Sequence, residues 1–365
     1  MDFLDAELDA LRVAGLLRSP PTFAGALVLC SNDYLGHAAS AVDGPRRHEP
    51  SGAGASRLVS GEHEAHAALE RDLAAWVGLE DALVFSSGYA ANVGLLGALA
   101  GEDDLIVSDA LNHASIIDGC RLSRARVAVT THGDVEAVER ALVAGAGARR
   151  RIVVIEAYFS MDGDVPDLAA LRRVCDRYRA VLVVDEAHSL GLFGPQGRGL
   201  CQEVGIRPDV LVGTLGKAVG LQGAFVAGSS PLKAWLWNRA RSFVFSTGVA
   251  PWLASLARER VGLVLADDAG RARLDAIVAR VRANLAALGA PVAPSRGPIV
   301  PWLVGEPRRA VELRDRLLER GLYVQAIRPP TVPDGTSRLR ITLHAGLTDP
   351  DVELLLERLG ELLDA

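Results

Sequence analysis

Lysine is almost absent from this chain. Among its 39 basic residues only Lys217 and Lys233 are lysines, and all the others are arginines. The formal net charge is −6, so the chain lacks the basic excess with which a protein neutralises nucleic-acid phosphates. We therefore expect no nucleic-acid partner, and each of the two lysines is a candidate for chemistry.

Cysteines are few and scattered. The four of them show neither a C-x-x-C spacing nor a histidine at metal-ligand spacing: Cys30, Cys120, Cys175 and Cys201. This pattern argues against a zinc site and a disulfide framework and favours a reduced, cytoplasmic protein without a bound metal. The acidic start lacks the basic region of a signal peptide, and no run of about 18 uncharged apolar residues predicts a membrane span.

The hydrophobic content of 49% is enough for a large core. Residues 2–17 have apolar positions on one helical face. From about residue 62, amphipathic helical segments alternate with short β-branched runs near 81–88, 104–109, 126–131, 151–157, 180–187 and 209–215. Such alternation predicts an α/β fold with a mostly parallel sheet covered on both faces.

Beyond about residue 250 the pattern changes to long arginine-rich helices, at 258–288 and 306–320, with shorter strands between them. We therefore expect three parts: an N-terminal helix and arm (1–40), a large α/β domain (41–255) and a small C-terminal α+β domain (256–365).

The segment "VLVVDEAH" (181–188) has the appearance of the acidic strand of a nucleotide-dependent motor. Such a motor also needs a G-x-x-x-x-G-K-[ST] loop upstream of that strand. The nearest match, "VGTLGKAVG", has Leu211 in place of the first glycine and Ala218 in place of the hydroxyl residue, and it follows the strand. The missing loop opposes the motor interpretation, which nucleotide binding would support.

A different site is consistent with the same residues. Asp185 and His188 end one buried strand and Lys217 follows the next, at the edge where open α/β sheets bind ligands. "SSGYAAN" (86–92) is a strand–glycine–helix junction whose free N–H groups could hold a phosphate. Taken singly, these could be a strand-end cap, a surface lysine and a turn. Together they suit pyridoxal phosphate, which needs a lysine for covalent attachment, an aspartate for the ring nitrogen and a phosphate site.

The chain resembles the α-oxoamine synthases, pyridoxal-phosphate enzymes of aspartate-aminotransferase fold (type I), over nearly its whole length. The resemblance is carried, in order, by "LCSNDYLG", "GAGASRLVSGEHEAHAALE", "FSSGYAANVG", "DALNHASIIDG", "FSMDGDVPDL", "VVDEAHSLGLFGPQGRG", "GTLGKAVGLQGAFVAG", "FVFSTGVAP" and "IRPPTVPDGTSRLRITL".

The resemblance implies a role for each matching residue. Lys217 would bind the cofactor covalently and then act as the base, Asp185 would hold the ring nitrogen, His188 the ring oxygen, and His113 would stack on the ring and touch substrate. Gly88 and Tyr89 would meet the phosphate, Ser160 and Thr214 would lie near the cofactor, and Arg18, Asn32, Thr331 and Arg340 would contact substrate. Thr247 would reach the phosphate bound by a neighbouring subunit, which implies a homodimer with shared active sites.

The amino-acid carboxylate needs a fixed donor, and arginine matches it with two parallel hydrogen bonds. A strand over "SRLRITL" places Arg338, Arg340 and Thr342 on one face. The family pattern favours Arg340 as the carboxylate donor and leaves Arg338 as a solvated charge.

The segments "RPPTVPDGTSRLRI" and "GASRLVSG" are most similar to family members that make 8-amino-7-oxononanoate in biotin biosynthesis. These condense L-alanine with a pimeloyl thioester, carried on coenzyme A or acyl carrier protein, and release CO2 and the free thiol. The alternatives are members that use glycine, namely 2-amino-3-ketobutyrate ligase and 5-aminolevulinate synthase, or a catalytically silent member that only binds cofactor.

Overall fold

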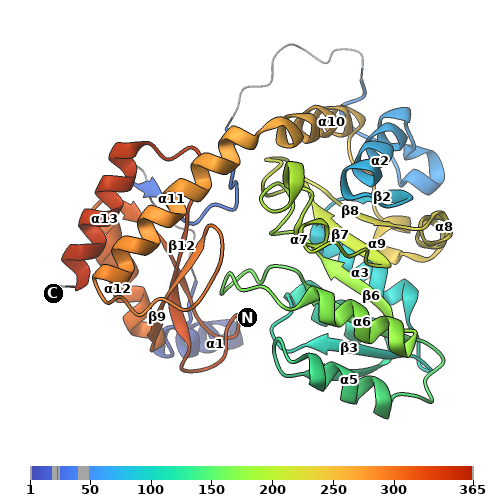
Figure 1. The fold of residues 1–365 in the computed structure, drawn as a ribbon, viewed down its shortest axis with the longest axis horizontal. Coiled ribbons are helices and arrows are strands. Elements are labelled where there is room, and N and C mark those ends of the chain that lie inside the picture. Colours follow the sequence, from blue (N-terminus) through green and yellow to red (C-terminus); the bar gives the residue numbers. More distant parts are fainter. Residues whose placement is uncertain (1, 19–22, 24, 40–48, 364–365) are drawn as a thin grey trace. The chain divides into compact units, whose positions relative to one another are not determined.

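The computed structural model describes residues 2–18, 23, 25–39 and 49–363. The chain forms two compact units (Figure 1). Unit 1 comprises Met1–Tyr34, Ser160–Asp164 and Ala269–Ala365, and unit 2 comprises Leu35–Phe159 and Val165–Asp268. The domain limits at residues 40 and 255 stay a prediction, because compactness alone does not define a domain.

Unit 2 is built on a seven-stranded sheet with the order β2-β8-β7-β6-β5-β3-β4. All the strands are parallel except β8, which runs antiparallel to both of its neighbours. The α/β fold with a mostly parallel sheet is thus confirmed. The strands are β2 (Asp81–Phe85), β3 (Leu105–Asp109), β4 (Arg126–Thr130), β5 (Arg151–Glu156), β6 (Val181–Asp185), β7 (Val210–Thr214) and β8 (Ala224–Gly228).

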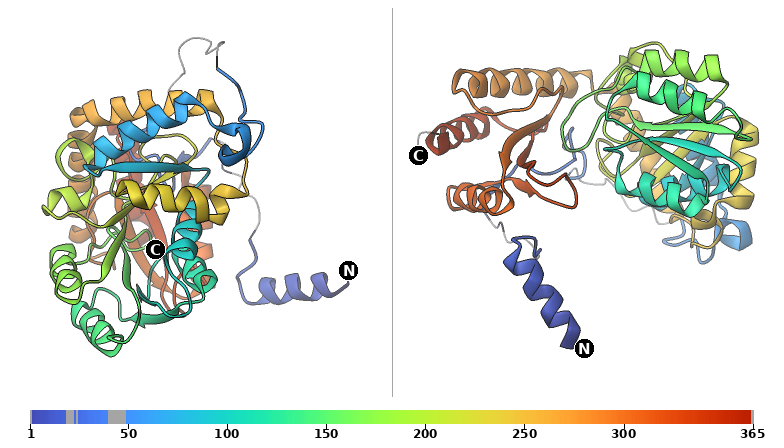
Figure 2. Two further views of the ribbon diagram at one scale, coloured as in Figure 1. Left: turned by 90° about the vertical axis from the view of Figure 1, so that its right-hand side faces the viewer. Right: turned by 90° about the horizontal axis from the view of Figure 1, so that it is seen from below.

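Helices cover both faces of this sheet (Figure 2). Alternate residues of the buried strands point to opposite faces, so Ile152 and Val154 of β5 join the core cluster beneath α3, α4 and α8. The helical segments of unit 2 are η1 (Arg57–Gly61), α2 (Glu64–Val77), α3 (Gly88–Leu99), α4 (Ala114–Ser123), α5 (Val135–Ala144), α6 (Leu168–Tyr178), η2 (Pro195–Gly197), α7 (Leu200–Glu203), α8 (Ser230–Arg239), α9 (Arg241–Val244) and α10 (Pro251–Ala266).

Unit 1 contains a three-stranded antiparallel sheet of order β11-β12-β9 and a parallel pair, β1 with β10. Its elements are α1 (Asp2–Val13), β1 (Leu27–Val28), α11 (Asp268–Ala287), β9 (Ile299–Gly305), α12 (Pro307–Glu319), β10 (Leu322–Tyr323), β11 (Gln325–Ile327), β12 (Ser337–Thr342) and α13 (Asp349–Leu363). The single helix expected at 258–288 is two helices, α10 and α11, which are separated at Asp267.

None of the helices in the described ranges has the length and apolar character that crossing a bilayer requires.

Candidate active site

Polar side chains end the central strands of unit 2 at one edge of the sheet. Asp185 is the last residue of β6 and is paired in register with Glu156, the last residue of β5. Thr214 ends the next strand, β7, which is parallel to β6. Because these strands are parallel, their carboxyl ends meet at the same edge, where the sequence predicts the ligand site.

Asp185 is held in place by two hydrogen bonds. The backbone N–H of Ala187 donates to its Oδ1 over 2.9 Å, and the side-chain amide of Asn92 donates to its Oδ2 over 2.8 Å. The carboxylate is 6% exposed, and His188 in the following turn is 7% exposed. A buried carboxylate held by neutral donors is stabilised by a cation placed against it, which is what a protonated ring nitrogen supplies.

The turn after β7 carries Lys217. The hydroxyl of Thr214 donates to the carbonyl of Gly223 over 3.1 Å and accepts the N–H of Gly216 over 3.1 Å. The N–H of Gly220 then donates to the carbonyl of Lys217 over 2.8 Å. Gly220 has a φ of +73°, a left-handed conformation that glycine adopts without strain. Thr214 therefore shapes the turn that presents the lysine.

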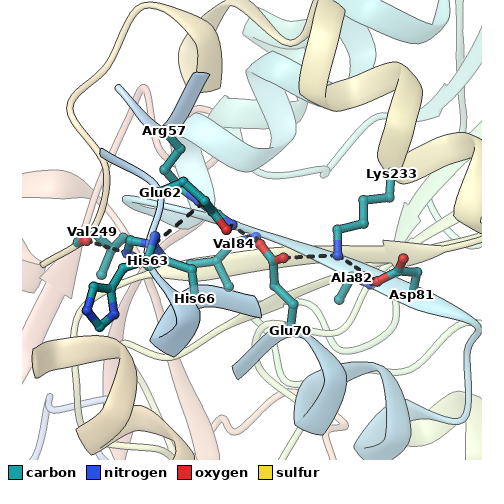
Figure 3. A network of polar contacts seen from close by, with 10 residues as sticks. All are labelled: Arg57, Glu62, His63, His66, Glu70, Asp81, Ala82, Val84, Lys233 and Val249. Atoms are coloured by element: carbon teal, nitrogen blue, oxygen red, sulfur yellow. Dashed lines mark hydrogen bonds and ion pairs between the residues drawn. The ribbon is translucent and has the colours of Figure 1, made fainter. Parts of the chain in front are cut away.

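The other lysine is engaged in ion pairs (Figure 3). Lys233 Nζ lies 3.0 Å from Oε2 of Glu70 and 2.8 Å from Oδ1 of Asp81. These two carboxylates raise the pKa of Lys233 although burial lowers it. An amine held in its charged form is a poor nucleophile, so Lys217 is the better candidate for covalent chemistry.

His113 is the N-cap of α4 and lies within electrostatic reach of Asp185 and Lys217. The residue as a whole is exposed at the surface of unit 2, but neighbouring atoms exclude part of the water from its imidazole ring. This desolvation lowers the pKa of His113, Lys217 lowers it further, and Asp185 raises it. The structure thus brings together the predicted lysine, aspartate and imidazole.

The start of α3 has the features of an anion site. The hydroxyl of Ser87 accepts the N–H of Ala90, whereas the N–H groups of Gly88 and Tyr89 have no hydrogen-bond acceptor within the described chain. A side-chain carbon added to Gly88 would meet no atom within 4 Å, so space is open there. Free N–H groups at a helix N-terminus suit a phosphate. The hydroxyl of Tyr89 is already bound to Asp118, over 2.7 Å.

The exposed residue Thr247 lies in a segment that is fixed from both sides. The N–H of Gly248 donates to the carbonyl of Ala55 over 3.0 Å, and Nε2 of His66 lies 2.6 Å from the carbonyl of Val249 (Figure 3). Arg57 lies beneath this segment, since a side-chain carbon on Gly248 would come within 2.8 Å of it. Thr247 is thus presented on an anchored loop, which suits the predicted contact with a neighbouring subunit.

Glu70 is the centre of the network that holds Arg57. Its carboxylate is 1% exposed, pairs with Arg57 and Lys233, and accepts the N–H of Val84 over 2.9 Å. We expect Glu70→Gln to lower the free energy of unfolding by about 3 kcal/mol, because it leaves a buried cation with less compensation. Urea-induced unfolding measures this loss.

Glu102→Gln is the matched control for that prediction. Glu102 pairs with Arg124 at the surface, where both side chains are more than 70% exposed, and we expect a loss of at most about 0.5 kcal/mol. Equal losses for the two variants would contradict a stabilising role of the buried network.

Arg340 on β12 in unit 1 is buried at 4% exposure. Its Nε donates to the carbonyl of Ser160 over 2.6 Å, Nη1 to Oγ1 of Thr342 over 2.8 Å, and Nη2 to Oδ1 of Asn32 over 3.1 Å. Within the described ranges no carboxylate forms an ion pair with it. The nearby Tyr34 does not supply a negative charge to balance Arg340 either, because burial raises the pKa of its phenol to about 12. Arg340 is therefore a fixed cation that a substrate carboxylate can neutralise.

The interpretation of Arg338 as a solvated charge is wrong. The side chain is 4% exposed and forms an ion pair with Asp162. Both arginines share one face of β12, as predicted, but only Arg338 has an internal counter-ion. Of the other expected substrate residues in unit 1, Arg18 donates to the hydroxyl of Thr331 over 3.2 Å.

These residues fit pyridoxal phosphate. Unit 2 offers a lysine amine, a buried carboxylate at a strand end, two imidazoles and a helix N-terminus with open space. Among the described residues no cluster of side chains has the composition of a metal site. Two polar residues that form hydrogen bonds with this set, Asn92 and Ser115, were not predicted from the sequence. The signal was weak: an asparagine within an apolar helix, and a serine two positions after His113.

Comparison with known proteins identifies the family. A family model described as aminotransferase class I and II matches residues 24–359. The chain is 48% identical to 8-amino-7-oxononanoate synthase of Anaeromyxobacter dehalogenans, covering 100% of this chain and 96% of the relative.

Several solved structures are also similar to this chain over most of its length. Serine palmitoyltransferase of Sphingomonas wittichii is 31% identical with a TM-score of 0.89, over 99% of this chain and 96% of that one. A further serine palmitoyltransferase, 27% identical with a TM-score of 0.88 over 99% and 96% of the two chains, was solved with PLP. The 8-amino-7-oxononanoate synthase of Francisella tularensis is 25% identical, with a TM-score of 0.78 over 93% and 98% of the two chains.

Proposed function

Because the chain belongs to the class I and II aminotransferase family, and within it to the 8-amino-7-oxononanoate synthases, we propose that it condenses L-alanine with a pimeloyl thioester. The carrier of the acyl group is coenzyme A or acyl carrier protein. The product is 8-amino-7-oxononanoate, a precursor of biotin, and the working unit is a homodimer with shared active sites. The observation that carries the proposal is the meeting of Lys217, Asp185 and His113 at one sheet edge.

The overall reaction balances without an oxidant or a reductant. The α-carbon of alanine loses its proton and forms a bond to the thioester carbonyl carbon, and the sulfur takes up a proton and leaves as the thiol. The alanine carboxylate leaves as CO2, and a proton takes its place on the same carbon. Bound pyridoxal phosphate draws electrons from the bonds at that α-carbon, which is chemistry that no side chain supplies.

The chain's own residues bind the groups and move the proton. Lys217 would hold the cofactor covalently, and once the amino acid is bound its Nζ would take the proton from the α-carbon. Asp185 would keep a positive charge on the ring nitrogen, and His188 would bind the ring oxygen. His113 would lie against the ring, where its imidazole would also limit the access of water.

Further residues fix the position of the reactants. The N–H groups of Gly88 and Tyr89 at the start of α3 would bind the phosphate, assisted by Thr247 of a second subunit. In unit 1, Arg340 binds the alanine carboxylate and Asn32 orients its guanidinium. We assign supporting substrate contacts to Arg18 and Thr331, and supporting cofactor contacts to Ser160 and Thr214.

The proposal is tested by substrate choice. The purified protein, supplied with pyridoxal phosphate, is incubated with pimeloyl-CoA and either L-alanine or glycine, or with palmitoyl-CoA and L-serine, and the products are identified by mass spectrometry. We expect kcat/KM for alanine to exceed that for glycine by at least about tenfold, since one methyl group in a fitted pocket contributes a factor of 10–200.

Two other outcomes of this test would each indicate a different relative. Faster turnover of glycine would favour an aminoketobutyrate ligase or aminolevulinate synthase. L-Serine is included because of the likeness to serine palmitoyltransferases, with palmitoyl-CoA as its acyl donor. Turnover of that pair in preference to alanine and pimeloyl-CoA would overturn the proposal.

A further inference from the structure

Four side chains from three elements form one continuous chain of hydrogen bonds at the sheet edge of unit 2. Oδ2 of Asp185 lies 2.8 Å from Nδ2 of Asn92 on α3. The same Nδ2 lies 3.0 Å from Oγ of Ser115 on α4, which lies 2.7 Å from Nδ1 of His113. Asn92 and Ser115 are 2% and 1% exposed, so the bonds that join Asp185, Asn92 and Ser115 are shielded from water.

The direction of every bond in this chain follows from the chemistry of the groups. A carboxylate can only accept, so Asn92 must turn its NH2 group towards Asp185. The second hydrogen of that NH2 group goes to Oγ of Ser115, and the serine hydroxyl hydrogen is left to donate to His113. The backbone N–H of Ser115 also donates to Nδ1 of His113, over 3.2 Å. With two donors aimed at it, Nδ1 carries no proton.

We propose that Asn92 and Ser115 are positioning residues which hold His113 as the neutral imidazole with its proton on Nε2, and which couple this state to the carboxylate of Asp185. Neither residue touches the reacting atoms; both act through His113 and Asp185. The consequence for catalysis rests on the proposed function, whereas the protonation state itself is a property of the protein without its cofactor.

The surroundings of the ring support the neutral form. Protonating Nδ1 would break the bond from the backbone of Ser115 and force the serine hydroxyl to turn. His113 also caps the N-terminus of α4, where the helix dipole disfavours a cation. Desolvation and Lys217 lower the pKa of His113 more than Asp185 raises it. The ring is therefore expected to charge only below its usual pKa of about 6.5.

A neutral His113 matters for the proposed chemistry because of Asp185. An imidazolium at this position would be a second cation competing for the charge of that carboxylate, which is needed on the ring nitrogen of the cofactor. A neutral ring also presents an uncharged face for stacking and keeps one N–H donor, at Nε2. Holding the tautomer with buried partners avoids its rearrangement during the reaction.

The test is nuclear magnetic resonance of the cofactor-free protein labelled with 15N in histidine, with the signals of His113 identified by their loss in His113→Gln. We expect Nδ1 to give the shift of an unprotonated ring nitrogen at neutral pH. Ser115→Ala should change the ratio of the Nε2–H to the Nδ1–H tautomer by about five- to tenfold in favour of Nδ1–H. This change corresponds to the loss of about one hydrogen bond. Ser115→Thr restores the hydroxyl and should restore the ratio.

Asn92→Asp gives a stronger test. The new carboxyl would lie beside the buried Asp185 and share one proton with it, which leaves its other oxygen facing Ser115 as an acceptor. The hydroxyl of Ser115 would then turn towards that oxygen, and Nδ1 of His113 would become the donor to Ser115. We expect the tautomer to reverse and the pKa of His113 to rise. Ser123→Ala is the matched control, because Ser123 is a buried serine of the same helix whose hydroxyl, among the described residues, bonds only the backbone of Cys120 and Ala125. It should leave the His113 signals unchanged.

A wild-type Nδ1 that carries the proton would overturn the inference, as would a Ser115→Ala protein with unchanged His113 signals. A second readout uses the holoenzyme: Ser115→Ala, but not Ser123→Ala, should shift the pH at which the visible cofactor band changes. If the His113 signals behave as expected while the wild type makes no product from alanine, the proposed function fails and the positioning role stands.

Discussion

Lys217→Ala is expected to abolish product formation, with kcat falling by at least about 10³-fold. The variant loses both the covalent anchor of the cofactor and the base at the α-carbon, and general acid–base catalysis alone contributes a factor of 10²–10⁴. The structure supports this residue because Lys233, the only other lysine in the sequence, is bound by Glu70 and Asp81. Product formation from L-alanine and pimeloyl-CoA, followed by mass spectrometry, measures the loss.

Two further variants separate the roles of Lys217. Lys217→Arg keeps a positive charge but cannot serve as an amine nucleophile or a neutral base, so it should be as inactive as the alanine variant. Lys233→Met should remain active and lose stability instead. The visible band of covalently bound cofactor should disappear in both Lys217 variants and persist in Lys233→Met. A Lys217→Ala protein with activity within about tenfold of wild type would contradict the assignment, since that loss is below the range for a catalytic base.

The strands that carry the site could be predicted from sequence because their signals are local. The continuous apolar run 181–184 followed by Asp185 predicts a buried strand with its carboxylate at the ligand edge, and the structure has β6 end at that residue. The antiparallel β8 was not predicted. Its run is short and lies between glycines, and its pairing with β2 joins segments more than 100 residues apart.

The contacts that complete the site depend on tertiary structure. Arg338 and Arg340 are equivalent in the pattern of β12, and only the fold shows that Asp162, 176 positions away, pairs with the first of them. In the same way Asn92 meets Asp185 across 93 positions. A sequence of this kind identifies residues at the ends of its elements, whereas the partners that set their charge and direction come from other elements.

Arg340→Ala is expected to lower kcat/KM for L-alanine by about 10²–10⁴-fold. A bidentate contact with a carboxylate supplies two charge-assisted hydrogen bonds, each contributing about 1.5–3 kcal/mol. Arg340→Lys keeps the charge but loses the planar pair of donors, so it should recover only part of this loss. The effect should be seen in the KM for alanine more than in the KM for the pimeloyl thioester, because only alanine brings the carboxylate that Arg340 binds.

Arg338→Ala is the matched control on the same face of β12. Arg338 is as buried as Arg340, but its charge is already compensated by Asp162. Removing it leaves that carboxylate without its cation, so the variant should lose stability by about 3 kcal/mol while its KM for alanine stays near that of wild type. If instead Arg338→Ala raised the KM for alanine and Arg340→Ala did not, the carboxylate site would have to be assigned to Arg338. If both variants lost only stability, neither arginine would bind the substrate, and the absence of an internal counter-ion at Arg340 would need another explanation.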